Sequence, residues 1–183
     1  SGYAGLGNVM VTATVQVVKS DSVSLWGLKI EGLTAHSIEE VVYPVIGGIV
    51  NSPESKMAIP SWMGHLYPDP SRELSNRTTK MARWVYPGMF SMQFLTIYDV
   101  AQSGFYSASN DSQAFQKEFR IRLNEKKQLV SDQVHFPEYK AVTGSYEMPY
   151  QAVIGGFKGD WFTAAEMYRN WGTRQEWAKN SRL

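Results

Sequence analysis

Cysteine is absent from this chain of 183 residues, and histidine occurs only three times. Without cysteine there are no disulfides, no catalytic thiolates and no cysteine-bound zinc. His36, His65 and His135 lack the H-x-H or H-E-x-x-H spacing of metal sites, so a metal would need ligands gathered from separate loops. We therefore expect no metal and no other cofactor.

Neither sign of charge is in excess, because 18 Lys and Arg are balanced by 17 Asp and Glu, for a net charge of +1. The basic residues are dispersed, whereas a nucleic-acid-binding surface needs them clustered on one face. No run of apolar residues approaches the roughly 18 that a membrane-spanning helix requires. We expect neither nucleic acid nor membrane as a partner.

The acidic residues also lack the spacing that would favour a catalytic pair. A glycosidase needs two carboxylates about 5 to 9.5 Å apart, and acids at positions i and i+2 of a strand would share one face. No two acids have that spacing, and the adjacent Glu39 and Glu40 would point to opposite faces. A G-x-S-x-G nucleophile motif is missing as well. We expect no catalytic residues in this chain.

Alternation of apolar and polar residues with period two runs through most of the sequence. Residues 9–17 alternate cleanly and predict a half-buried strand. Residues 115–123 repeat the pattern with one wet face, and Lys117 is the exception on the apolar side. Polar turns separate these and weaker strand patterns, at residues 22–31, 40–46, 89–98, 104–108, 128–135 and 150–157. This favours a mainly β fold, an antiparallel β-sandwich.

Residues 51–87 break the pattern and contain several prolines, which predicts a long irregular loop with a functional role. Aromatic rings near turns can stack on the apolar face of a sugar, while Asn and Asp can hydrogen-bond its hydroxyls. Candidates for carbohydrate binding are Trp62, Trp84, Tyr106, Asn110 and Asp111. The alternative is that these residues belong to the core or its rim.

Helical periodicity appears near the C-terminal end. Asp160 is a suitable N-cap, and the large or apolar residues after it fall on one helical face at Trp161, Ala164, Ala165, Tyr168 and Trp171. The glycine-rich segment 155–159 lacks the G-K-[ST] ending of a phosphate-binding loop, so we interpret it as a tight turn. This predicts a sandwich over residues 1–158 and one C-terminal helix within 159–183.

Residues 159–171 read GDW-x-x-AA-x-x-YR-x-W. This resembles a signature of bacterial glycoside-hydrolase-like proteins of unknown function. In that group the motif joins an N-terminal β-supersandwich, similar to galactose mutarotase domains, to a (β/α)8 barrel. Weaker motifs such as Gly104-Phe105-Tyr106 resemble the preceding strands, so that the resemblance extends over roughly residues 86–177.

The resemblance implies a supersandwich fold, of which this chain is the later part, and catalysis in a barrel (a TIM barrel) outside the chain. It also implies an extracytoplasmic location, periplasmic or secreted. The helix would then be a linker that contacts the barrel, through the interface residues Asp160, Trp161, Tyr168, Arg169 and Trp171.

Three functions stay open on this basis. The first is a non-catalytic accessory sandwich that braces the catalytic domain of a carbohydrate-active enzyme and contacts glycan. The second is an independent carbohydrate-binding module with Trp62 and Trp84 as its platform. The third is a small mutarotase-like sugar enzyme, although the few histidines and unpaired acids argue against its acid–base chemistry.

Overall fold

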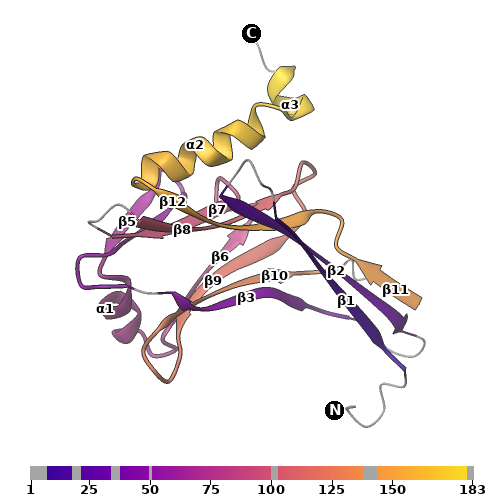
Figure 1. Cartoon of the computed structure of the whole chain (residues 1–183), viewed down its shortest axis with the longest axis horizontal. Helices are drawn as coiled ribbons and strands as arrows, with labels where there is room; N and C mark the ends of the chain where they lie inside the picture. The colour runs from indigo at the N-terminus through magenta and orange to yellow at the C-terminus, as the bar shows by residue number, and fades with distance from the viewer. Residues whose placement is uncertain are drawn as a thin grey trace.

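The computed structural model describes residues 8–17, 22–33, 38–49, 51–99, 103–137 and 144–180. Within them the chain forms two antiparallel sheets packed face to face, with α2 lying across the outer face of the larger sheet (Figure 1). This confirms the mainly β, sandwich-type fold class that alternation predicted.

The larger sheet has the order β1-β2-β12-β8-β7-β4-β5, with β11 also paired to β2. Its strands are β1 (Met10–Val17), β2 (Val23–Leu33), β4 (Lys56–Ile59), β5 (His65–Pro68), β7 (Phe94–Tyr98), β8 (Ser103–Asn110), β11 (Gly144–Glu147) and β12 (Gln151–Lys158). The smaller sheet has the order β3-β10-β9-β6. Its strands are β3 (Val41–Ile49), β6 (Met81–Tyr86), β9 (Lys117–Leu123) and β10 (Leu129–His135). The helices are α1 (Pro70–Ser75), α2 (Trp161–Gly172) and α3 (Glu176–Lys179).

The main core lies between the two sheets and is centred on Phe119 of β9. The Phe119 ring packs against the Phe90 ring with centroids 4.9 Å apart, and Leu95 of β7 belongs to the same buried cluster. Because adjacent residues of a strand point to opposite faces, Phe94 of β7 faces outward instead and packs under α2. The strand β7 is therefore buried on both faces.

Residues 51–87 are not the irregular loop that we predicted. They contain β4, β5, α1 and β6. The strands β4 and β5 have four residues each and carry little periodic signal; β4 is fixed by pairing with β7, and the six-residue β6 by pairing with β9. The prolines mark element ends: Pro68 ends β5, and Pro70 opens α1 behind the N-cap Asp69.

Strand β1 forms where alternation predicted it, but the prediction that it is half-buried is wrong. All eight of its residues are exposed. Among the described residues the strand pairs with β2 alone, at the edge of the larger sheet, and none of its residues belongs to a core cluster. Alternation therefore identified a face that suits burial, while the described part of the fold leaves that face uncovered.

The C-terminal helix that we predicted is α2, and α1 and α3 are further short helices. The helix α2 ends at Gly172, and α3 begins at Glu176 after a turn at Thr173. Ala164 is fully buried against the larger sheet, as its place on the predicted face required. In the described residues no helix has the length and apolarity needed to cross a membrane.

Replacing Phe119 by Ala should leave a large cavity between the sheets. We expect a loss of about 3 to 5 kcal/mol in the free energy of unfolding, measured by urea titration. The matched control is Val85→Ala on the neighbouring strand β6, where the side chain is partly exposed and the loss should be below about 0.5 kcal/mol. Equal losses in both variants would contradict this placement of the core.

Candidate functional site

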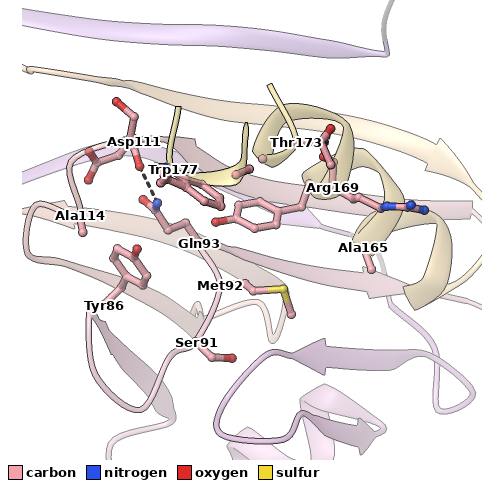
Figure 2. A pocket seen from close by; sticks show the side chains of 14 residues that line it. Tyr86, Ser91, Met92, Gln93, Asp111, Ala114, Ala165, Arg169, Thr173 and Trp177 are labelled. Carbon is pink, nitrogen blue, oxygen red and sulfur yellow. Dashed lines mark hydrogen bonds between the residues drawn. The ribbon is translucent and has the colours of Figure 1, made fainter. Parts of the chain in front are cut away.

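An open cleft of about 610 Å³ lies between the two C-terminal helices and the loops of the sandwich (Figure 2). The segment before β7 contributes Met92 and Gln93, and the turn after β8 contributes Asp111 and Ala114. Opposite them, α2 contributes Tyr168 and α3 contributes Trp177. The walls are thus largely apolar and aromatic, with polar groups both on the sandwich side and on the helical side, where Arg169 and Thr173 also line the cleft.

Directly behind the cleft, the ammonium group of Lys117 is completely buried. It forms an ion pair with Asp111 and donates to the Gln93 side-chain oxygen at 2.9 Å and to the Phe115 carbonyl at 2.8 Å. Two aromatic rings also lie within cation–π distance of the Lys117 Nζ, Tyr86 at 4.8 Å and Tyr150 at 4.3 Å. Every donor of this buried cation is therefore engaged.

Burial lowers the pKa of Lys117 to about 8, because the charged form loses its hydration, and the hydrogen bond and charge of Asp111 oppose that shift. The ion pair is thus what keeps a lysine charged at this depth near neutral pH. The broken alternation at Lys117 marks a cation that faces the interior, not a slip in the strand.

Asp111 and Gln93, which bind Lys117, also form hydrogen bonds with the backbone. The Asp111 carboxylate accepts from the backbone N–H groups of Gln113 at 2.9 Å and Phe115 at 2.7 Å, besides Lys117. The Gln93 amide donates to the Asp111 backbone carbonyl at 2.7 Å, the bond drawn in Figure 2. These groups hold the turn after β8 and the segment before β7 in place, and they leave no free carboxylate for proton transfer.

A second polar connection involves His135 of β10. One ring nitrogen, Nε2, meets the Tyr43 carbonyl, which can only accept, so Nε2 carries the proton. The other nitrogen, Nδ1, then accepts from the Tyr150 hydroxyl at 2.6 Å. Burial lowers the pKa of His135 to about 4, so the ring is neutral near pH 7. Burial likewise raises the pKa of Tyr150 far above its usual value, which keeps the hydroxyl a donor.

The helix α2 joins this polar region to the outer face of the sheet. Its Tyr168 ring packs on Phe94 with centroids 5.4 Å apart, and a chain of ring contacts continues through Trp171 to Trp177. Asp160 caps the first turn by accepting from the Phe162 N–H at 2.9 Å. The helix is therefore held firmly at its start and along its inner face.

The two C-terminal helices expose large aromatic residues, at the start of α2 and, beside the cleft, on α3. Trp161, Phe162 and Trp177 are 49%, 55% and 51% exposed. Trp161 also borders a second hollow of about 370 Å³, which it shares with Met63 and Leu66 from the β4–β5 region. Several apolar side chains at the start of α2 and in the neighbouring turn are thus without cover in this chain.

The predicted carbohydrate-binding residues do not come together. Trp84 and Tyr106 are buried in separate core clusters, which leaves neither ring a free face for a sugar. Asp111 is buried in the lysine network, and Asn110 is half-buried at the end of β8. Only Trp62, which is 72% exposed in the turn after β4, presents an open ring.

The predicted interface residues all lie on or beside α2. Asp160 is the cap, Trp161 is exposed, and Tyr168 and Trp171 are half-buried in the ring chain. Arg169 is exposed, and in Figure 2 its side chain extends along the helix, away from Asp111 and Gln93.

Of the three histidines, His36 lies outside the described residues, His65 is exposed and His135 is buried. No group of three or more His, Asp or Glu suited to a metal occurs in the part of the chain that the structure describes.

Sequence reasoning missed the lysine network. The signal was the inward position of Lys117 in an otherwise apolar strand face, which we noted only as an exception. Its partners Gln93 and Asp111 are 24 and 6 residues away along the chain. Nothing in the sequence spacing could have paired them.

Comparison with known families gives one short match. Residues 146–183, less than a quarter of the chain, match the family described as a domain of unknown function (DUF6259). No curated protein sequence matches the chain.

Solved glycoside hydrolases contain a similar fold. The α-N-acetylgalactosaminidase NagBb from Bifidobacterium bifidum, in complex with GalNAc, superposes with a TM-score of 0.59 and 10% identity, over 98% of this chain and 32% of that chain. For the α-galactosidase from Lactobacillus brevis the TM-score is 0.59 and the identity 11%, over 85% and 22% of the two chains. The galactosidase domain of the α-galactosidase-sucrose kinase AgaSK gives 0.57 and 6%, over 82% and 22%. At these identities the likeness shows the fold, and the chain spans less than a third of each of these proteins.

Replacing Lys117 by Met should leave the Asp111 carboxylate buried without its cationic partner. We expect a loss of about 3 to 5 kcal/mol in the free energy of unfolding, measured by urea titration. Lys126→Met, in an exposed turn, is the matched control and should change stability little. The double variant Lys117→Met with Asp111→Asn should recover part of the loss, since no unpaired charge remains. Failure to recover any stability would argue against the ion pair as the cause.

His135 should make stability depend on pH. Between its unfolded pKa of about 6.5 and its folded pKa of about 4, the unfolded chain binds a proton that the folded protein does not. Lowering the pH through this window therefore reduces the free energy of unfolding by up to about 3 kcal/mol. In His135→Gln this contribution should disappear, so the stability difference between the two proteins shrinks as the pH falls. His65→Gln, on exposed β5, is the control. A constant difference across the window would refute the assignment.

Proposed function

We propose that the chain is a non-catalytic accessory β-sandwich of a larger carbohydrate-active enzyme, and that a catalytic domain packs against α2 and α3. The observation that carries this proposal is the exposure of Trp161, Phe162 and Trp177 on these helices. Trp161 and Phe162 lie side by side with ring centroids 5.9 Å apart, and adjoining exposed aromatics of this size are typical of an interaction surface. The likeness to parts of an α-galactosidase and an α-N-acetylgalactosaminidase supports the carbohydrate-active context.

The chemistry of the cleft supports a non-catalytic role. Hydrolysis of a glycosidic bond needs two carboxylates, and among the described residues that line the two hollows Asp111 is the only acid. Its carboxylate is already occupied by Lys117 and two backbone N–H groups. A domain that braces its neighbour needs only a rigid contact surface, and the lysine network and the capped helix α2 make this surface rigid. A (β/α)8 barrel as that neighbour, and an extracytoplasmic location, follow from the motif resemblance alone and are part of the proposal.

The proposal predicts that exposed helix residues matter more in the longer protein than in this chain. We expect Trp161→Ser with Phe162→Ser to leave the Tm of residues 1–183 within about 2 °C, since the side chains are half-exposed here. In the protein translated from the whole reading frame, the same change should lower the Tm of the first calorimetric transition by several degrees. Trp62→Ala is the matched control and should affect both forms equally. Identical small shifts of the double variant in both forms would overturn the bracing role.

Trp62 favours a second candidate function, binding of glycan by the sandwich itself, because its ring is 72% exposed. If that function holds, titration of residues 1–183 with oligosaccharides should give saturable binding in calorimetry. Trp62→Ala should weaken that binding by at least tenfold, because the sugar would stack on the open face of the Trp62 ring. Trp161→Ser, on another exposed ring, is the control. Binding that survives Trp62→Ala unchanged would exclude this platform.

A further inference from the structure

The outer edge of β1 lacks the features by which proteins protect a strand edge. Natural edges are shortened, bulged, charged or interrupted by proline, because unpaired N–H and C=O groups recruit other strands. Strand β1 has eight residues, MVTATVQV, without charge or proline. Its pairing with β2 runs through all eight residues without a register shift.

The other edge strands of the described sandwich are protected. In the larger sheet, β5 has four residues and ends at Pro68, and β11 also has four. In the smaller sheet, β3 contains Pro44 and register shifts, and β6 carries the exposed Arg83. The contrast singles out β1 as an edge that is open to a further strand.

The side chains of β1 also suit pairing. Val11, Ala13 and Val15 lie opposite Ile30, Leu28 and Trp26 of β2, and opposed residues share a face of the sheet. Ile30 and Leu28 belong to a buried core cluster. The apolar face of β1 thus continues a core face, yet Val11 is 59% exposed and Val17 is 73% exposed.

We propose that β1 pairs antiparallel with β1 of a second copy of this chain, which joins the two larger sheets into one. A strand without charge can approach its own copy without like-charge repulsion. Two registers keep like faces together, one centred on Ala13 and one on Thr14. In both, valine lies opposite valine or alanine, and Thr14 lies opposite Thr14 or Thr12 of the copy.

The pairing forms a small interface, because it rests on one strand from each copy. Interfaces at the low end of the size range are weak and transient, so dissociation constants in the micromolar range are expected. The edge lies on an element different from α2 and α3, at the opposite end of the sheet order from β5. The inference therefore stands whether or not a catalytic domain covers the helices.

Sedimentation velocity of residues 1–183 tests the pairing. We expect the average mass to rise toward that of a dimer as the concentration increases from about 1 to about 200 µM, the range that spans a micromolar dissociation constant. Thr14→Lys and Thr14→Glu, at an exposed position, should each sediment as monomers, because the like charges are directly opposed in the register centred on Thr14 and are diagonal neighbours in the register centred on Ala13. An equimolar mixture of the two variants should dimerise again, since the charges are then opposite.

Met63→Lys is the matched control, because Met63 is fully exposed on the β4–β5 turn and carries the same change of charge. It should dimerise like the parent chain. A parent chain that is monomeric throughout the range would overturn the proposal, as would dimers that persist in Thr14→Lys or a mixture that stays monomeric. Slow exchange in the monomer of those β1 amides that point away from β2 would also overturn it, because the outer edge would then be covered within one copy.

Discussion

The buried ammonium of Lys117 is the interaction on which the arrangement of the sandwich depends. It lies on β9 of the smaller sheet, while its acceptors Gln93 and Asp111 lie next to β7 and β8 of the larger one. A charge in such a place is costly unless every donor is satisfied, and here each one is. The pair therefore fixes how the two sheets meet at this end of the molecule. Gln133 makes a comparable link elsewhere, from β10 to Ser107 and Ser109 of β8.

Apolar packing supplies most of the stability of the sandwich, and these polar links determine the position of one sheet relative to the other. Phe119 and its neighbours would tolerate small sliding of one sheet over the other, since dispersion contacts have little direction. Hydrogen bonds to a charged group have strict geometry. The walls of the cleft follow from that geometry, because Gln93 and Asp111 both hold Lys117 and line the cleft. A support for a neighbouring domain benefits from such fixed surfaces.

The sequence predicted those elements whose pattern lies within one continuous segment of the chain. Alternation identified β1 and β9, and Asp160 with the residues after it identified α2. Alternation did not predict β4 and β5, which have only four residues each, or β6, because these strands are defined by their partners in space. It also misplaced the aromatics: Trp84 and Tyr106 looked suitable for a surface, and only the packing of the sheets shows that they are buried.

The same limit applies to charge. A lysine in a strand is normally a surface residue, and only the three-dimensional positions of Asp111 and Gln93 explain why Lys117 faces inward. For β1 the error was of the opposite kind. Its pattern is that of a strand with one covered face, and all eight residues are exposed in the part of the chain that the structure describes.

The junction between β12 and α2 has a mechanical consequence. Only Gly159 and Asp160 separate the two elements; Gly159 has a positive φ and no room for a side chain beside Thr163, and Asp160 caps the helix. A junction of two residues, one of them bonded to the first turn, is short for a hinge. A torque applied to the helix passes directly into β12, which is paired to β8 along all eight of its residues. The helix α2 and the larger sheet would therefore move together as one rigid body.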